Sequence, residues 1–283
     1  MANIQSKKLS LINLGCGTRF HPDWVNIDKY PVNQNVMAHD FRQSLPFADN
    51  TFDVVYHSHV LEHFSRTEGK IFLKECFRIC KPGGIIRIVV PDLENIVRSY
   101  LHVLEEGLSG NPEAAVKYNW MMLELFDQAV RIRPGGDMAL YVKNASPDLQ
   151  AFISSRMGHQ LVDGLRNYSK KRKRVLFPIT KITGKKILDK IRKYTFLGIS
   201  FILYGKCGIV TTNEVLSRSS GEIHKWMYDR YSLRQILNEI GFKNSIIFTA
   251  FESNIRDWQG FNLDSDPDGS IYKPDSLYCE AFT

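Results

Sequence analysis

Three histidines fall within seven residues of one another in the stretch YHSHVLEHF, residues 56–64. Imidazole at this density has two chemical uses: it can take a proton from a hydroxyl group near neutral pH, or it can ligate a metal ion. A shared metal site would need the preceding strand to continue through His57 and His59, so that both side chains lie on one side. His63 falls one turn into the next helix beside Glu62, where a packed, hydrogen-bonded histidine is expected. We therefore predict acid-base chemistry here and no metal site.

A second candidate site lies in LINLGCGTRF, residues 11–20, where an apolar strand breaks into Gly15, Cys16 and Gly17. The loss of side chains at a strand end lets a ligand approach the backbone, as nucleotide cofactors do. The dinucleotide fingerprint needs three glycines and an acidic residue roughly 20 positions further on. Only two glycines are present, and Asp28 comes too early for a full helix between two strands. The loop indicates a cofactor site of another kind.

The composition is that of an ordinary globular protein. Its 283 residues, 43% hydrophobic and 24% charged, suffice for one large domain or two small ones. Five cysteines, an odd number without CxxC spacing, argue against a disulfide framework or a zinc cluster and favour a reducing compartment. The first ten residues lack the apolar segment of a leader, and no run reaches the roughly 18 apolar residues of a membrane span. These features predict a cytoplasmic protein.

The net charge of +7 is concentrated in one segment. Residues 170–193 hold eleven Lys or Arg and one acidic residue, a net charge of +10, so the rest of the chain carries −3. A nucleic-acid-binding surface is therefore not expected. The charges flank the apolar run TFLGISFILYG, residues 195–205, which is too short to span a bilayer but suited to lie at its surface. We expect the segment 170–205 to contact an anionic membrane peripherally, to attract a diphosphate-linked glycan, or to form a solvated basic face beside a buried helix.

Short apolar runs predict seven buried strands. Between the fourth and fifth, Ser65 and Glu68 are spaced as a capping box, and apolar residues recur with helical spacing until the stop at residues 81–84. A helix that crosses between two strands is typical of a parallel sheet. A second amphipathic helix, YSLRQILNEIGF, precedes the last two strands and completes an open α/β sheet. The strands are expected at residues 9–14, 25–28, 35–40, 52–57, 85–90, 245–251 and 276–282.

The sheet is interrupted by residues 96–222, a stretch far longer than a crossover needs and largely helical in pattern. An insertion after the fifth strand lies above the carboxyl ends of the strands, where open α/β sheets bind ligands. We expect it to form a lid or substrate domain. The predicted organisation is a cofactor-binding half, residues 1–95, the insertion, residues 96–222, and a closing helix and strand hairpin, residues 223–283.

Six motifs, in their order and spacing, resemble class I S-adenosylmethionine-dependent methyltransferases, and more narrowly the type 11 branch found among glycan-modifying enzymes. They are INLGCG, VNID, HDF, LPFADNTFDVVYHSHVLEHF, LKECFRICKPGGIIRIVVPD and HKWMYDRYSLRQILNEIGF. The resemblance covers roughly residues 9–95 and 223–283. It implies a Rossmann-like methyltransferase fold with a seven-stranded mixed sheet, and S-adenosylmethionine as the cofactor.

The resemblance also implies where the cofactor binds. Gly15 and Gly17 let the backbone approach its methionine part, Asp28 accepts the ribose hydroxyls, and Asp40 and Phe41 contact the adenine. The full implied set is Asn13, Gly15, Cys16, Gly17, Arg19, Asp28, Asp40, Phe41, His57 and Ser58.

Two departures from the family pattern stand out in this loop. Asn13 replaces an acidic residue, and the third glycine is absent. Seven residues separate Gly17 from Val25, so the usual helix must be missing or a single turn. Its positive N-terminus would be lost with it, and Arg19 is a candidate to pair with the cofactor carboxylate instead, or is a surface residue.

Methyl transfer to a hydroxyl needs a base to take the proton during attack. In the resemblance His59 aligns nearest the methyl group, with His57 as the alternative base and Asp92 as a residue that orients the base, binds substrate or caps a helix. Aromatic and polar side chains that suit a sugar face gather in HKWMYD: His224, Trp226, Tyr228 and Asp229.

The resulting hypothesis is O-methylation of a sugar or glycan precursor. One alternative is methylation of another small-molecule or lipid-linked acceptor, and another is a cofactor-binding scaffold without turnover.

Overall fold

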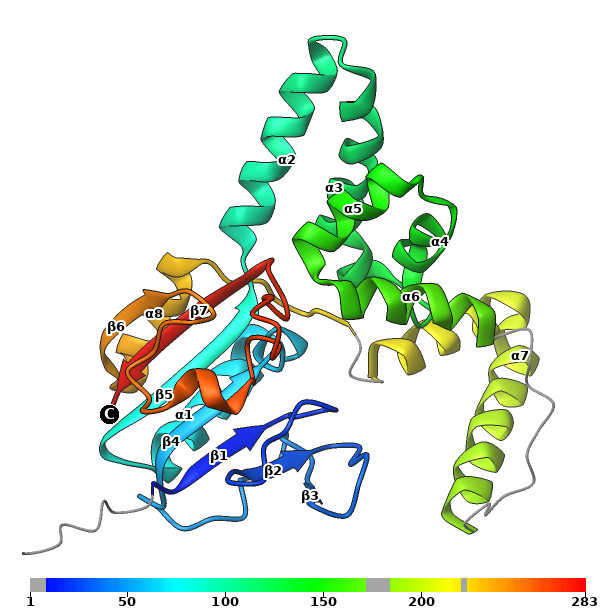
Figure 1. Ribbon diagram of the computed structural model, residues 1–283. Coiled ribbons are helices and arrows are strands. Elements are labelled where there is room, and N and C mark those ends of the chain that lie inside the picture. The colour runs from blue at the N-terminus through cyan, green and yellow to red at the C-terminus, as the bar shows by residue number, and fades with distance from the viewer. Residues whose placement is uncertain (1–8, 172–183, 220–222) are drawn as a thin grey trace, which may run out of the picture.

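The computed structural model describes residues 9–171, 184–219 and 223–283 (Figure 1). Its centre is a seven-stranded sheet in the order β3-β2-β1-β4-β5-β7-β6, in which β7 runs in the opposite direction to the other six described strands. The predicted mixed sheet of the Rossmann-like methyltransferase fold is thereby confirmed. The strands are β1 Leu11–Leu14, β2 Val25–Asp28, β3 Val36–Ala38, β4 Phe52–Ser58, β5 Cys80–Pro91, β6 Lys243–Phe248 and β7 Ser276–Phe282.

Two helices, α1 Arg66–Ile79 and α8 Arg230–Ile240, cover one face of the sheet. The predicted capping box begins α1: the backbone N–H of Glu68 donates to Ser65 Oγ, and the N–H of Ser65 donates to the Glu68 carboxylate at 2.9 Å. The stop expected at residues 81–84 is wrong in position, because β5 starts at Cys80 directly after the helix.

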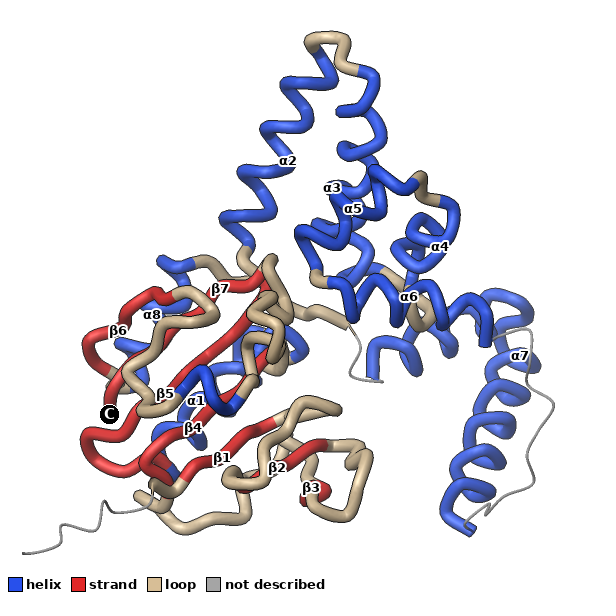
Figure 2. The backbone as a smooth tube through the Cα atoms, in the orientation of Figure 1, coloured by secondary structure: helices blue, strands red, loops and turns tan. Residues whose placement is uncertain are grey.

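The opposite face of the sheet is covered by a long loop. As predicted, no helix lies between β1 and β2, where the described residues 15–24 form turns. The connection between β6 and β7, which includes the short helix η2 Trp258–Phe261, packs there instead (Figure 2). Tyr56 of β4 contacts Trp24 and Trp258, with ring centroids 5.9 and 5.4 Å apart. Aromatic packing therefore replaces the helices on this face.

The insertion begins at the carboxyl end of β5 and lies above the sheet (Figure 1). Trp120, Met121 and Ile153 are buried in a hydrophobic core of its own. Its position over the strand ends is the place predicted for a lid or substrate domain. Its helices are α2 Leu93–Leu108, α3 Pro112–Val130, α4 Gly136–Asn144, α5 Pro147–Met157, α6 His159–Lys171 and α7 Gly184–Ser219.

The last of these, α7, turns back on itself at Gly205, where φ is 60° and ψ is −145°. Thr212 Oγ1 donates to Ser200 Oγ at 2.9 Å, although residues 12 apart in a straight helix would be separated by roughly 18 Å. Gly208 packs so closely that a Cβ there would lie 2.1 Å from the Ser200 carbonyl oxygen. We call the two arms, residues 194–204 and 206–215, the α7 hairpin.

The expectation that no segment reaches the length of a membrane span is wrong. Tyr194–Val215 is 22 residues long with a mean hydropathy of 1.3, so by length and composition alone it could cross a membrane. Only 11% of this segment is buried inside the protein. The turn at Gly205 divides this segment into two short arms. Half of the basic segment 170–193, residues 172–183 with four of its eleven Lys and Arg, lies outside the described residues. Exposed apolar side chains of the hairpin are Tyr194, Phe196, Ile199, Phe201, Ile202, Leu203, Tyr204, Val210 and Val215.

Candidate active site

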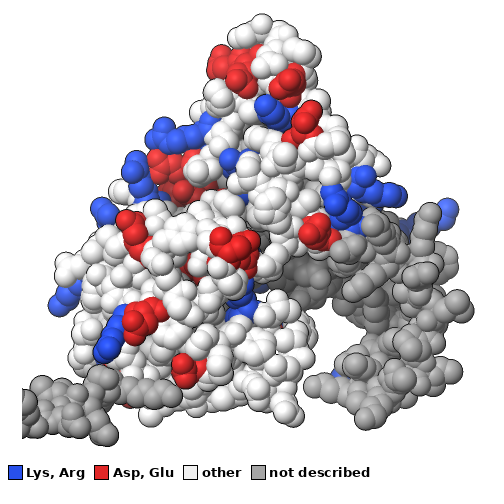
Figure 3. Space-filling view, viewed as in Figure 1, with Lys and Arg blue, Asp and Glu red and all other residues white. Residues whose placement is uncertain are grey.

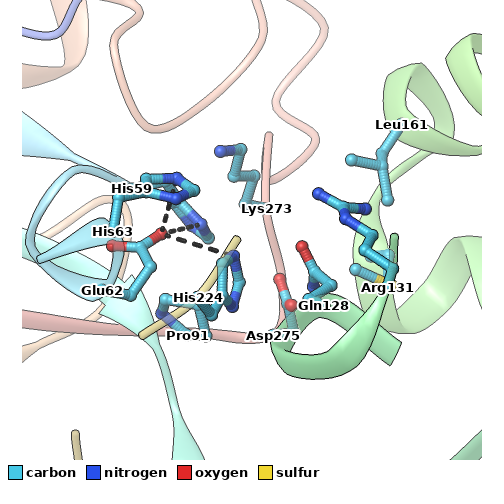
Figure 4. A pocket seen from close by; sticks show the side chains of 11 residues that line it. His59, Glu62, His63, Pro91, Gln128, Arg131, Leu161, His224, Lys273 and Asp275 are labelled. Atoms are coloured by element: carbon cyan, nitrogen blue, oxygen red, sulfur yellow. Dashed lines mark ion pairs between the residues drawn. The ribbon is translucent and has the colours of Figure 1, made fainter. Parts of the chain in front are cut away.

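A polar cavity of about 290 Å³ lies between the carboxyl ends of the central strands and the insertion (Figure 4). Figure 3 shows the molecular surface hollowed where the two parts meet. The insertion therefore supplies one wall of the site, from α3, α5 and α6. The lining residues are His59, Glu62, His63, Pro91, Gln128, Arg131, Met157, Leu161, His224, Lys273 and Asp275.

His59 stands in the cavity wall directly after β4, as predicted. Its backbone has φ = 53°, in the left-handed region that a histidine seldom adopts and that occurs at functional sites. Its Nδ1 lies 3.2 Å from Glu62 Oε1, and its Nε2 lies 2.9 Å from Ser276 Oγ. Burial lowers the pKa of His59 to about 4, so the ring is neutral near pH 7. A proton on Nδ1 facing the carboxylate leaves the Nε2 lone pair free to accept one.

Glu62 follows in the short helix η1 Leu61–His63, and the sequence analysis did not assign it a role. It is fully buried; its Oε1 lies 3.2 Å from His59 Nδ1, and its Oε2 has no hydrogen-bond partner among the described residues. The Nε2 atoms of His63 and His224 each lie 4.0 Å from its Oε1 (Figure 4). Burial would raise the pKa of Glu62, but the facing histidines, His59 foremost, lower it below its usual range and keep the carboxylate ionised.

His63 and His224 are far apart in the sequence but adjacent in the structure. Their rings meet edge to face with centroids 5.1 Å apart, and His63 Nδ1 is 3.2 Å from the carbonyl oxygen of Ile223. His63 is hydrogen-bonded as expected, but it also lines the cavity. His224 is buried, which lowers its pKa to about 3, and it occupies the site predicted for it.

Lys273 and Asp275, just before β7, are cavity residues that the sequence analysis missed. Burial raises the pKa of Asp275 to about 7 and lowers the pKa of Lys273. No local motif marks either residue, because they reach the cavity through the pairing of β7 with β5.

The glycine loop adjoins this cavity. A Cβ on Gly15 would lie 2.2 Å from a methyl carbon of Val60, the residue after His59. A second cavity, of about 440 Å³, is lined by Thr18 of the loop and shares Arg131 and Lys273 with the first. The predicted cofactor loop and the polar cavity are therefore neighbours.

The structure brings Asp28 to the glycine loop. Gly17 N–H donates to Asp28 Oδ2 at 2.8 Å, and a Cβ on Gly17 would meet nothing within 4 Å, so the loop is open toward a ligand. Cys16 is buried between the glycines, and burial raises the pKa of its thiol to about 12. These residues fit the cofactor predicted for them: open backbone for the methionine part and a carboxylate for the ribose.

Two other loop residues make contacts within the protein. The Asn13 amide is buried and donates to the carbonyl of Arg19 at 3.0 Å, which holds the loop in place. Arg19 pairs with Asp266 at 2.6 Å and lies over the Tyr272 ring at 3.9 Å. Arg19 is therefore engaged within the protein, and its predicted pairing with the cofactor carboxylate stays a prediction.

Asp40 and Phe41 follow β3, which ends at Ala38 rather than at residue 40. The Arg42 side chain pairs with Asp40 and lowers the pKa of that carboxyl to about 2. Phe41 is half-buried and meets Phe72 of α1 edge to face at 5.8 Å. The adenine contacts predicted for this pair therefore stay predictions.

Three other candidates, two in β4 and one directly after β5, do not line the polar cavity. His57 is fully buried, its ring meets Phe72 at 5.2 Å, and burial lowers its pKa to about 4. It is a core histidine rather than the alternative base, because β4 ends at Ser58 and the left-handed backbone of His59 breaks the alternation that would put both rings on one side. Ser58 ends β4 and pairs in register with Val89.

Asp92 caps α2, accepting from the N–H groups of Glu94 and Asn95 at 3.0 and 3.2 Å, so capping is the role that the structure supports.

Of the four residues predicted to bind substrate, His224 alone lines the cavity. Trp226 is 42% exposed and lies beneath the Arg66 guanidinium. Tyr228 is buried in the core, where burial raises its pKa to about 12. Asp229 caps α8 together with Ser232. None of these three lines the cavity, so their predicted contact with substrate stays a prediction.

Residues 16–88 match the family described as the methyltransferase domain. This segment, about a quarter of the chain, is similar to a methyltransferase domain. The predicted cofactor, S-adenosylmethionine, agrees with this match. The match ends within β5 and does not reach the insertion or the last three strands.

A demethylmenaquinone methyltransferase from Corynebacterium urealyticum is 35% identical over 83 residues, which are 26% of this chain and 35% of that protein. The chain thus matches about a third of the length of this relative. A methyltransferase from Archaeoglobus fulgidus is 12% identical, covering 97% of this chain and 86% of that one, with a TM-score of 0.35. A Haloferax volcanii methyltransferase bound to its activator Trm112 is 11% identical, covering 97% and 82%, with a TM-score of 0.37.

Proposed function

We propose that this protein transfers a methyl group from S-adenosylmethionine to an oxygen of an acceptor held in the polar cavity. The observation that carries the proposal is the adjacency of the open glycine loop and His59, joined by the contact of Val60 with Gly15. When bound, the cofactor supplies a methyl group on a positively charged sulfur. The protein then has to position the acceptor, exclude water and remove a proton.

His59 is the proposed base. The acceptor hydroxyl would replace Ser276 as the donor to Nε2, while Glu62 holds Nδ1 and stabilises the imidazolium that forms. As the O–H proton passes to Nε2, the oxygen electron pair forms the new C–O bond. The C–S bond breaks, its electron pair stays on sulfur, and the products are the methyl ether and S-adenosylhomocysteine.

The acceptor proposed is a sugar or glycan precursor. Eight of the eleven cavity residues are polar or charged, which suits a molecule with several hydroxyl groups better than an apolar ring. The name of the Corynebacterium relative suggests a quinone acceptor, but its match covers only 26% of this chain, less than the cofactor-binding half. Methylation of a quinone or another lipid-linked acceptor is the second candidate, favoured by the exposed apolar hairpin of α7.

A peripheral site on the cytoplasmic face of a membrane is also proposed. The α7 hairpin exposes a row of large apolar side chains and follows a basic run in the sequence. Each arm of about ten residues is too short to cross a bilayer, so the hairpin would lie in the interface. The five cysteines are free thiols, which supports a reducing compartment.

The first test is transfer of tritiated methyl groups from S-adenosylmethionine to a panel of nucleotide-activated sugars, with demethylmenaquinone in detergent as a parallel acceptor. We expect label in a methyl ether of a sugar. His59→Asn should lower turnover about a hundredfold or more, because the base is lost, and leave S-adenosylhomocysteine affinity nearly unchanged. Asparagine is chosen because it tolerates the left-handed backbone of residue 59.

His102→Asn is the matched control, since His102 is 72% exposed on α2 and should have no effect. Full turnover in His59→Asn would exclude the proposed base. Label found only in the quinone would favour the second candidate. Tight binding of S-adenosylhomocysteine without transfer to either class of acceptor would favour the scaffold alternative.

A further inference from the structure

Glu62 carries a buried negative charge that the proposed base alone does not balance. Its side chain is 0% exposed, its Oε2 lacks a hydrogen-bond partner among the described residues, and its Oε1 is met by imidazole nitrogens. His59, His63 and His224 all face Oε1 (Figure 4). Burying a carboxylate without a counter-charge or a hydrogen-bond donor costs free energy. The side that His63 and His224 turn toward Glu62 therefore determines whether its charge is balanced.

The hydrogen bond at His63 Nδ1 determines whether its other nitrogen, Nε2, carries a proton or a lone pair. The Ile223 carbonyl oxygen can only accept, so His63 Nδ1 carries the proton. In the neutral ring Nε2 then points a lone pair at Glu62, 4.0 Å away, and two electron-rich atoms face one another. A histidine that donates through one nitrogen to a backbone carbonyl and offers the other is the usual arrangement of a metal ligand.

We propose that Glu62, His63 and His224 bind a divalent transition-metal ion such as zinc. One oxygen and two nitrogen ligand atoms lie within 4.8 Å of one another. Two histidines and one carboxylate are the donor set of catalytic zinc sites and of sites that keep open positions for substrate. Ligand atoms about 2.1 Å from a tetrahedral ion are roughly 3.4 Å apart, so the 4.0 Å separations need a small inward movement.

The open positions of the ion would face the polar cavity, which the same three residues line. There the ion would polarise the acceptor hydroxyl and ease its deprotonation by His59, a role that rests on the proposed function. The histidines of residues 57–63 do not by themselves predict a metal site, because only one of them, His63, belongs to this ligand set. The third ligand, His224, lies some 160 residues away and comes from the segment before α8.

Cobalt(II) titration of tag-free, EDTA-treated protein tests the site, using a Cys207→Ser background because Cys207 is an exposed thiol. We expect one equivalent of Co²⁺ to bind with visible absorption bands and to be displaced by Zn²⁺. Glu62→Gln and His63→Gln should each weaken binding more than about a hundredfold, since losing a ligand exceeds the 10- to 100-fold loss from removing a ligand's supporting partner. Circular dichroism checks that each variant folds.

His102→Gln is the matched control, an exposed histidine that pairs with Glu106 outside the cavity. Absence of a stoichiometric Co²⁺ complex in the parent protein would overturn the site, as would unchanged binding in both folded variants. If Glu62→Gln does not fold, His63→Gln decides alone, because its side chain is 27% exposed. Methyl transfer that survives EDTA would remove the ion from the reaction but leave the proposed function standing.

Discussion

Gly15 and Gly17 lack side chains for different reasons. Both have positive φ, but a Cβ on Gly15 would collide with Val60, whereas one on Gly17 would enter open space. Position 15 requires glycine because the loop packs directly against Val60 there. The second keeps backbone accessible beside the Asp28 carboxylate, where a ligand can approach.

Asp28→Ala should weaken S-adenosylhomocysteine binding by about 1.5 to 3 kcal/mol, the range for hydrogen bonds to a charged group. The carboxylate would accept the ribose hydroxyls while Oδ2 keeps its bond from Gly17. Calorimetric titration measures the change. Asp257→Ala, at a 78% exposed side chain, is the control and should bind as the parent does. Unchanged affinity in folded Asp28→Ala protein would remove Asp28 from the cofactor site.

Among the described elements, α7 departs furthest from what its local pattern indicates. Its 36 residues contain one non-helical residue, Gly205, and the hydrogen bond between Ser200 and Thr212 holds the two arms together. Glycine allows the turn because its positive φ is free of Cβ strain. The turn converts a segment with the length and composition of a membrane span into a hairpin that exposes Ile202 and Leu203.

The parent protein should sediment with vesicles that contain anionic lipid at low salt and be released as ionic strength rises. Apolar burial of the hairpin drives binding, and each basic residue near the surface adds about 1 kcal/mol, which salt screens. Ile202→Glu with Leu203→Glu should abolish sedimentation, because these side chains are 81% and 66% exposed. The same change at Leu101 and Leu108, exposed apolar residues of α2, should not. A parent protein that ignores such vesicles at low salt would refute the membrane proposal.

Across the whole molecule, Arg87 ties the sheet to the loop that covers its second face. This fully buried residue of β5 pairs with Asp264 and Glu280 at 2.8 Å each, and donates to the carbonyls of Thr249 and Glu252. Tyr56 shares Asp264 through a 2.7 Å hydrogen bond. The network anchors the β6–β7 connection, which later supplies Lys273 and Asp275 to the cavity.

Arg87→Met should lower the free energy of unfolding by about 3 to 5 kcal/mol, because it leaves two buried carboxylates without a counter-charge. Urea titration followed by tryptophan fluorescence measures it. Adding Asp264→Asn and Glu280→Gln should recover part of the loss, since the unpaired charges go. Arg98→Met, at a 73% exposed side chain, should stay within about 0.5 kcal/mol of the parent. An equally small effect of Arg87→Met would show that the network is not needed for stability.

The sequence by itself determined the features that depend on near neighbours. Alternation and apolar runs locate the strands, Ser65 and Glu68 set the start of α1, and the short spacing from Gly17 to Val25 excludes a helix. The position of His59 after β4 follows from the same local order. These features are predictable because each is decided by contacts or steric limits within a few residues.

Only the tertiary structure decided which distant groups meet. Sheet pairing brings Lys273 and Asp275 to the cavity, and the return of the chain before α8 places His224 beside Glu62. Arg19 finds Asp266, 247 positions away, instead of remaining available for a ligand. Local sequence patterns do not predict such long-range contacts, because the contacts depend on the order of strands and on how loops cross the sheet. The burial of Glu62 and its three histidine neighbours could therefore be recognised only from the tertiary structure.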